Sequence, residues 1–354
     1  MMSIIFLIIA FAALILSHEF GHFIAAKKSG MKVEEFGFGF QPRFFKIKMG
    51  ETTYSFNAIP FGGFVKIPGE DGEKGSERIE GSFSSKSISL RFLVIIAGVT
   101  FNVILAWILM SFGFALGTPV SSSMVPRGAL LEETSIVIVQ IAKNSPAELS
   151  GLKPGDRLVT FSKVEDVQSF INGNAGKEIE LRYQRGKVFS SAILTPRINP
   201  PEGEGAIGIA MDEIGILKLP FYASIWEGAK TTYNLTVGTS VAFFNFAADA
   251  IKGKPVLDAI AGPVGIVSIT GDAAKLGFVY LLNFVAFLSI NLAILNILPF
   301  PALDGGRLVF LLVEKIKGSP VSAKFAGITH SVGMVILMFF MLLVTYHDIA
   351  RLVF

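Results

Sequence analysis

Four segments of this chain are apolar and long enough to cross a lipid bilayer. They cover approximately residues 4–26, 92–114, 277–299 and 325–346. A hydrocarbon core of about 30 Å requires roughly 20 helical residues, so each segment can form one span. Charged residues make up only 17% of the chain, whereas soluble domains contain about 25%. We therefore expect a polytopic α-helical membrane protein with about four transmembrane helices.

The cations beside these segments set the expected orientation. No Lys or Arg precedes the first span, whereas Lys27 and Lys28 follow it, and Arg91 opens the second span. Residues 307–324, between the third and fourth spans, contain four Lys or Arg residues. Short connections rich in Lys and Arg stay in the cytoplasm. Both connections are therefore expected inside, with both termini and the long segment before the third span outside.

The first span contains the motif His18-Glu19-Phe20-Gly21-His22. Residues four apart share one helix face, so His18 and His22 can bind one Zn²⁺ together. Glu19 lies beside that face, where it can take a proton from a water molecule at the metal. Ionisable side chains are costly in hydrocarbon and occur there mainly at functional sites. Because the helix carries this motif, and residues 1–3 lack signal-peptide cations, we expect it to be retained.

A catalytic zinc ion needs a third protein ligand and an open position for water. Asp304 lies at the cytoplasmic end of the third span, which is expected to run from outside to inside, as the first span does. Asp304 and His22 both lie near the cytoplasmic ends of their spans, so topology places them at about the same depth. Asp304 is therefore the candidate third ligand. The chain contains no Cys, which excludes thiolate ligands and disulfides.

Residues 33–68, which follow the first span (1–32), are expected to form a membrane-associated β region. Two strand-like runs flank Gly50-Glu51, which indicates a hairpin. Two Phe- and Gly-rich stretches, 36–40 and 60–64, are too apolar for an ordinary cytoplasmic loop. The sheet either rests on the membrane or offers an edge that pairs with an extended substrate strand. Residues 69–90 are polar and Gly-rich and are expected to be a cytoplasmic linker.

The soluble domain is expected at residues 118–211, after a second span at 91–117. Strand patterns at 135–141, 178–183 and 189–195 accompany the stretch Gly151-Leu152-Lys153-Pro154-Gly155-Asp156. That stretch resembles the turn and strand of bacterial PDZ domains, so we expect one extracytoplasmic α+β PDZ domain. PDZ domains bind extended peptides by strand addition. The alternative is a steric plug with an empty groove.

Residues 212–275 are expected to form amphipathic and connecting helices outside the membrane. Residues 235–251 are fairly apolar but include Thr, Ser, Asn and Asp. If they crossed the bilayer, the four cations at 307–324 would lie outside, so we expect a helix on the outer face. The remaining boundaries are a third span with the Asp304 motif at 276–306, a cytoplasmic loop at 307–324, and a fourth span with the C-terminus at 325–354.

Taken together, these features resemble the site-2 protease family (M50) of intramembrane zinc metalloproteases, in particular the bacterial branch typified by the regulator of sigma-E protease. The resemblance is carried by the His18–His22 motif, residues 98–102, the single PDZ-like domain, Gly262-Pro263-Val264 and residues 296–306. It implies His18, His22 and Asp304 as zinc ligands and Glu19 as the general base.

The same resemblance implies three substrate-binding residues. Asn296, eight residues before Asp304, would help to hold the substrate backbone, and Asn291 lies earlier in the same helix. Asn102 belongs to a Gly-x-x-x-Asn segment in which Val99 stands where Pro is common. Asn291 and Asn296 could instead form hydrogen bonds between helices. His330, in the fourth span, matches no family position and is interpreted as a packing or interfacial residue.

The implied reaction is hydrolysis of peptide bonds within transmembrane segments of single-span proteins that another protease has already trimmed, such as anti-sigma factors or signal-peptide remnants. The expected location is the bacterial cytoplasmic membrane. No nucleic-acid partner is expected, because the net charge is only +3. The alternative is a non-proteolytic PDZ scaffold with a structural zinc site. A zinc transporter would need several polar spans lining a path, whereas this sequence offers one ligand cluster near one face.

Overall fold

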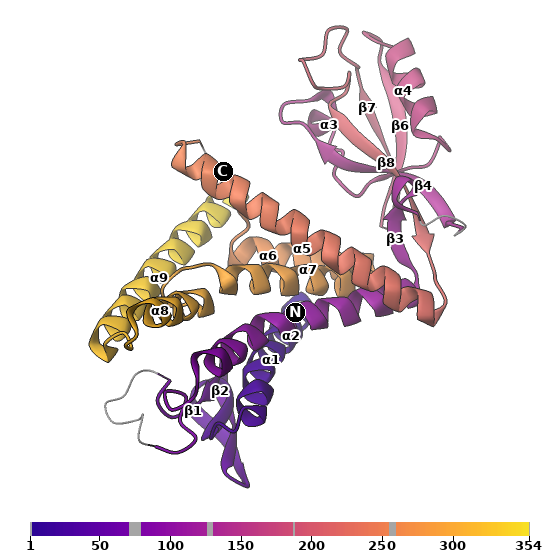
Figure 1. The fold of residues 1–354 in the computed structure, drawn as a ribbon. Helices are drawn as coiled ribbons and strands as arrows, with labels where there is room; N and C mark the ends of the chain where they lie inside the picture. Colours follow the sequence, from indigo (N-terminus) through magenta and orange to yellow (C-terminus); the bar gives the residue numbers. More distant parts are fainter. Residues whose placement is uncertain (1, 71–78, 126–129, 187, 255–259, 354) are drawn as a thin grey trace. The chain divides into compact units, whose positions relative to one another are not determined.

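The computed structural model describes residues 2–70, 79–125, 130–186, 188–254 and 260–353 (Figure 1). The chain folds into two compact units, residues 1–111 with 225–354, and residues 112–224. The part of the chain that the structure describes contains four helices long and apolar enough to cross a membrane. These candidate spans are Ile5–Lys28, Ile88–Leu116, Phe278–Ile297 and Ala323–Arg351. The prediction of a polytopic helical membrane protein is confirmed.

Helix α7 (Phe278–Ile297) packs against both α1 (Met2–Lys28) and α2 (Ile88–Leu116). Apolar side chains of α1 and α7 form one buried cluster, and those of α2 and α7 form another. Helices α1 and α2 approach each other closely at Gly21, where a Cβ atom would lie 2.8 Å from the carbonyl carbon of Ala97. These three helices therefore form the core that holds the histidine motif.

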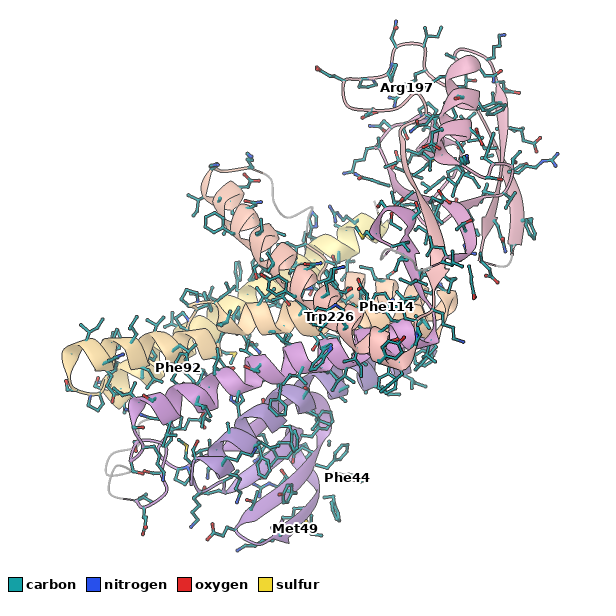
Figure 2. All side chains as sticks on the ribbon, turned by 45° about the vertical axis from the view of Figure 1, so that its right-hand side comes forward. Phe44, Met49, Phe92, Phe114, Arg197 and Trp226 are labelled. Atoms are coloured by element: carbon teal, nitrogen blue, oxygen red, sulfur yellow. The ribbon has the colours of Figure 1, made fainter. Side chains whose placement is uncertain are left out.

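The predicted hairpin is confirmed as strands β1 (Glu35–Met49) and β2 (Thr52–Lys66), joined at Gly50-Glu51. The hairpin curls, because Glu35 pairs with both Thr53 and Lys66. The beginning of β1 therefore lies between the two ends of β2. Phe44 and Met49 project from the far end of the hairpin and are exposed (Figure 2). An exposed apolar tip is compatible with the prediction of a membrane-associated sheet.

Residues 307–324 differ from the expected loop. Most of them belong to helix α8 (Asp304–Lys317), which ends at Gly318 in the left-handed conformation. Asp304 is the first residue of this helix rather than the end of the third span, and residues 298–303 connect α7 to it. The last helix, α9 (Ala323–Val353), follows α8 after a short turn. The third candidate ligand is thus held by a helix N-terminus.

Helix α5 (Phe221–Ile251) is not one of the four candidate spans in the described chain. It packs against α2 at two places. The Nε1 of Trp107 on α2 donates a hydrogen bond to the carbonyl of Ile225 on α5 at 2.9 Å. A Cβ atom at Gly228 on α5 would lie 2.8 Å from the backbone nitrogen of Ser111 on α2. Aromatic side chains such as Trp226 are exposed (Figure 2). Polar side chains such as Lys230 and Asn234 are exposed as well, so the expected amphipathic helix on the outer face stays a prediction. The shorter helix α6 (Pro263–Leu276) leads into α7.

Residues 112–224 contain one antiparallel sheet in the order β3-β8-β4-β5-β6-β7. Its strands are β3 (Thr118–Ser121), β4 (Glu132–Ile141), β5 (Arg157–Leu158), β6 (Ile179–Arg185), β7 (Val188–Leu194) and β8 (Ile209–Leu217). A 3₁₀ turn (Ser122–Met124) and helices α3 (Pro146–Leu149) and α4 (Val164–Gly173) complete the unit. Because β8 continues to Leu217, the expected boundary at residue 211 is too early.

The stretch 151–156 has a structural role in this unit. The Asp156 carboxylate is fully buried, accepts a hydrogen bond from the backbone N–H of Lys153 at 2.8 Å, and forms an ion pair with Arg185. This contact raises the pKa of the Arg185 guanidinium above its ordinary value. The turn is therefore fixed to strand β6. The assignment of the unit as a PDZ domain stays a prediction.

Candidate active site

Helix α1 presents His18 and His22 on one face, one turn apart. Their Nε2 atoms lie 3.1 Å from each other. The Nδ1 of His22 lies 2.8 Å from the carbonyl oxygen of Val94 on α2. A carbonyl can only accept, so Nδ1 carries the proton and donates to it, which leaves the Nε2 lone pair of His22 free to bind a metal.

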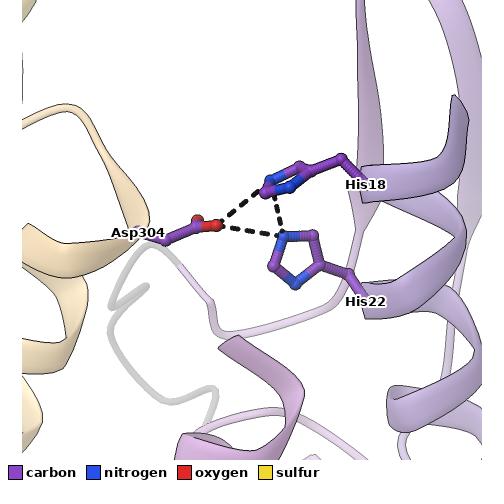
Figure 3. Close-up of side chains that lie close together, drawn as sticks. All are labelled: His18, His22 and Asp304. Atoms are coloured by element: carbon purple, nitrogen blue, oxygen red, sulfur yellow. Dashed lines mark hydrogen bonds and ion pairs between the residues drawn. The ribbon is translucent and has the colours of Figure 1, made fainter. Parts of the chain in front are cut away.

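Asp304 meets this pair from α8 (Figure 3). Its Oδ2 atom lies 3.1 Å from Nε2 of His18 and 3.3 Å from Nε2 of His22. The next residue, Gly305, lets the start of α8 pack closely against the end of α7. A Cβ atom at Gly305 would lie 2.5 Å from the carbonyl carbon of Leu298, which is too close for a larger residue.

The three side chains fit a zinc ion. A tetrahedral zinc with bonds of about 2.0–2.1 Å separates its ligand atoms by about 3.3–3.4 Å. The three ligand atoms here are 3.1–3.3 Å apart. Two imidazoles and one carboxylate also leave a fourth position open, as in catalytic rather than structural zinc sites. Among the described residues, only these three form such a cluster.

A cavity of about 720 Å³ opens onto the cluster. Glu19 lines it beside His18 and His22, and β2 passes close by, since a Cβ atom at Gly63 would lie 2.8 Å from Cγ of Glu19. Asn296 also lines the cavity, with its Nδ2 atom 3.4 Å from both ring nitrogens of His18. The candidate zinc ligands, the Glu19 carboxylate and the Asn296 amide thus share one chamber, which can accommodate a peptide group.

Comparison with known proteins shows the family of the chain. Residues 6–340 match the model of peptidase family M50. The chain belongs to peptidase family M50. A provisionally named zinc metalloprotease of Clostridium perfringens is 37% identical over 98% of both chains. The regulator of sigma-W protease RasP of Bacillus subtilis is 30% identical over 99% of both chains. A zinc metalloprotease RasP of Geobacillus kaustophilus is 28% identical over 99% of this chain and 98% of its own.

This M50 peptidase is therefore a zinc metalloprotease and a membrane protein, with Zn²⁺ as its cofactor. The prediction of an enzyme is confirmed, which leaves the non-proteolytic scaffold without support. Five of the seven candidate site residues meet in the cavity, namely His18, Glu19, His22, Asn296 and Asp304.

The other two candidates do not line the cavity of the M50 peptidase. Asn291 donates a hydrogen bond from Nδ2 to the carbonyl of Phe287 in its own helix, at 2.8 Å. Asn102 is fully buried, and neither atom of its amide finds a hydrogen-bond partner among the described residues. In this conformation neither side chain is placed to contact a substrate in the cavity, and their predicted substrate contact stays a prediction.

Several side chains near the site of the M50 peptidase were missed by sequence reasoning. Arg307, one turn beyond Asp304, forms an ion pair with Glu70, and both line the cavity. Arg91 of α2 forms two hydrogen bonds with the buried carboxylate of Glu314 on α8. These pairs join segments more than 200 residues apart, so no local pattern signals them. Both tie α8, and with it Asp304, to the rest of the site.

His330 of α9 also lines the cavity. The sequence offered a signal for it, because an imidazole within an apolar span indicates a functional site by default. The expected packing or interfacial role does not include a place in the cavity lining.

Proposed function

We propose that this M50 peptidase hydrolyses peptide bonds within the transmembrane segments of single-span membrane proteins. The observation that carries the proposal is the position of the site. His18, Glu19 and His22 belong to a helix that is itself a candidate span, and the cavity beside them adjoins a second candidate span at Asn296. A protease that acts on soluble chains does not need its catalytic groups on membrane helices, where ionisable side chains are costly.

In the proposed mechanism, His18, His22 and Asp304 hold Zn²⁺. When bound there, the ion supplies a Lewis acid that polarises a peptide carbonyl and makes a neighbouring water more acidic. The Glu19 carboxylate accepts a proton from the attacking water as its oxygen bonds to the carbonyl carbon. Glu19 then returns the proton to the amine nitrogen as the carbon–nitrogen bond breaks. Asn296 donates hydrogen bonds to the substrate backbone.

A helical peptide bond is shielded by its own hydrogen bonds, so the substrate must unwind before cleavage. Strand β2 offers a means of holding the unwound chain. Its residues 63–66 pair with β1 along one edge, and no strand in the described part of the chain pairs with the other edge. Residues 62–66 also line the cavity. A substrate strand added to this edge would lie beside Glu19.

The proposed setting is the bacterial cytoplasmic membrane, with both termini and residues 112–224 outside and the site near the cytoplasmic side. The sheet unit would act as a PDZ domain that filters substrates by size or reads a new carboxyl end. One relative is named a regulator of sigma-W protease, which supports substrates of regulated proteolysis, such as anti-sigma factors trimmed by an earlier cut, alongside signal-peptide remnants.

The test is cleavage in detergent of a single-span substrate shortened on its outer side, with the products mapped by mass spectrometry. Wild type is compared with Glu19→Gln, and a soluble unfolded polypeptide serves as the second substrate. We expect wild type to cut the span within its apolar segment and Glu19→Gln to leave it intact. Equal cutting by both proteins would disprove the role of Glu19. Cutting confined to the soluble polypeptide would disprove the proposed substrate class.

A further inference from the structure

Helix α9 contributes one residue to the cavity lining of the described chain, and that residue is His330. The rest of the lining comes from α1, Glu34 just before β1, β2 with the residues after it, α7, and the segment around Asp304. His330 therefore belongs to the same chamber as Glu19 and the three candidate zinc ligands, although it is on a different span.

Two contacts fix the turn of α9 that carries His330. One turn further along the helix, Gly333 packs against the segment before Asp304, since a Cβ atom there would lie 2.6 Å from Cβ of Pro301. Near the start of α9, the ring of Phe325 contacts that of Phe310 on α8, with 6.5 Å between centroids. His330 is thus held beside the segment that positions Asp304.

No hydrogen bond or ion pair in the described chain explains why an imidazole stands at position 330. Its side chain is half-buried, and the described residues make no hydrogen bond or ion pair with its ring. It is also not a member of the ligand cluster, whose atoms lie within 4.8 Å of one another and come from His18, His22 and Asp304. An imidazole is costly in an apolar span unless it serves a function. Its ring nitrogens are therefore available to a molecule that enters the cavity.

An imidazole can form hydrogen bonds with the peptide groups of an extended chain. When neutral it offers one N–H donor and one nitrogen acceptor, and an extended backbone presents carbonyl acceptors and N–H donors in alternation. We propose that His330 is a substrate-contacting residue that hydrogen-bonds the backbone of the chain being cleaved. This inference rests on the proposed function and adds a contact from the fourth span, whereas β2 and Asn296 contact the substrate from other elements.

Cross-linking tests the contact without requiring turnover. The chain contains no Cys, so His330→Cys in a zinc-loaded Glu19→Gln protein provides a single thiol. The substrate carries one Cys, moved in turn through each position around the cut. Asn296→Cys, which also lines the cavity, reports that the substrate has entered. Ser331→Cys is the matched control, because Ser331 follows His330 on α9 but is exposed and does not line the cavity.

We expect disulfides from His330→Cys and Asn296→Cys at a few substrate positions near the cut, and none from Ser331→Cys. Cross-linking of Asn296→Cys without His330→Cys would overturn the inference and leave the proposed function standing. No cross-linking of either variant would overturn both, because the span then does not enter the cavity. Equal cross-linking of Ser331→Cys would show random collision and also overturn the inference.

Kinetics supply the second measurement. His330→Phe keeps the ring shape and removes the hydrogen bond, so kcat/KM should fall about five- to fiftyfold with zinc content unchanged. His330→Gln, which retains a donor and an acceptor, should recover part of the loss, and Ser331→Ala should behave as wild type. An unchanged kcat/KM in His330→Phe would overturn the inference. Should His330→Phe fail to fold, the comparison of His330→Gln with wild type and the cross-linking decide.

Discussion

Gly98 of α2 lies directly against the two histidine rings of α1. A methyl group at this position would lie 2.7 Å from Cε1 of His22 and 2.8 Å from Cε1 of His18. Distances below 3.0 Å are too short for carbon atoms in contact, so any larger residue must displace a ring. The absence of a side chain at Gly98 therefore decides how closely α2 can approach the candidate zinc ligands.

Gly98→Ala should accordingly weaken zinc binding. Overpacking a fitted site costs about 1–3 kcal/mol, so we expect zinc affinity to fall about 10–100-fold and cleavage to fall with it. The measurement is zinc competition against a chelator of known affinity. Gly327→Ala on α9 is the matched control, because a Cβ atom there meets nothing within 4 Å. Wild-type zinc affinity in Gly98→Ala would contradict the observed packing.

Ala302, two residues before Asp304, adopts a left-handed backbone conformation with φ of 79°. This conformation costs an L-residue roughly 1–2 kcal/mol but is open to glycine. We expect Ala302→Gly to keep activity and to equal or exceed the thermal midpoint of wild type. Ala302→Val should lower both the midpoint and the zinc affinity, because a β-branched residue tolerates positive φ poorly. Thermal unfolding in detergent with zinc titration checks this, and equal behaviour of the two variants would contradict it.

Removing only one partner of the Arg91–Glu314 pair should destabilise the protein more than removing both. Both side chains are largely buried, and one of their hydrogen bonds measures 3.0 Å. Removing one partner of a buried pair leaves an uncompensated charge, at a cost of about 3–5 kcal/mol. We expect Arg91→Ala to lower the thermal midpoint and the zinc affinity, because α8 carries Asp304.

The double variant Arg91→Met with Glu314→Leu supplies the control for that prediction. It removes both charges and keeps apolar volume, so it should be less destabilised than either single variant. Losses that simply add in the double variant would show that the two side chains act independently.

The orientation in the membrane can be tested with single cysteines, because the chain contains none. Lys317 lies at the end of α8 and Leu149 in the sheet unit, and both are exposed. We expect an impermeant thiol reagent, applied to intact cells, to label Leu149→Cys and to spare Lys317→Cys until the cells are opened. The reverse pattern would contradict the orientation inferred from the flanking cations.

The spans and the candidate ligand set could be predicted from the sequence. Apolar segments of membrane length predict helices, and the spacing of His18 and His22 places both on one face. The prediction that Asp304 and His22 lie at the same depth in the membrane follows from the expected orientation of the first and third spans. The first two conclusions depend on helix geometry, and the third depends on the cations beside the spans.

What the sequence could not show depends on tertiary contacts. The small size of Gly98 matters only because α2 crosses α1 at that point, and Glu314 is significant only because Arg91 faces it. The face of α9 that carries His330 is set by the packing of Gly333 against Pro301. Helix α8 differs from the expected loop because its apolar residues recur at helical spacing and Leu311 is buried, although its charged residues are typical of a cytoplasmic connection.

The most direct test of the central claim is the zinc content of purified variants. We predict one zinc per chain in wild type and in Glu19→Gln, which loses only the base. His18→Ala and Asp304→Ala should each lose the tightly bound zinc while keeping their folded helices by circular dichroism, because two ligands hold zinc far more weakly than three. Retention of one tightly bound zinc by Asp304→Ala would contradict the assignment of His18, His22 and Asp304 as the metal site.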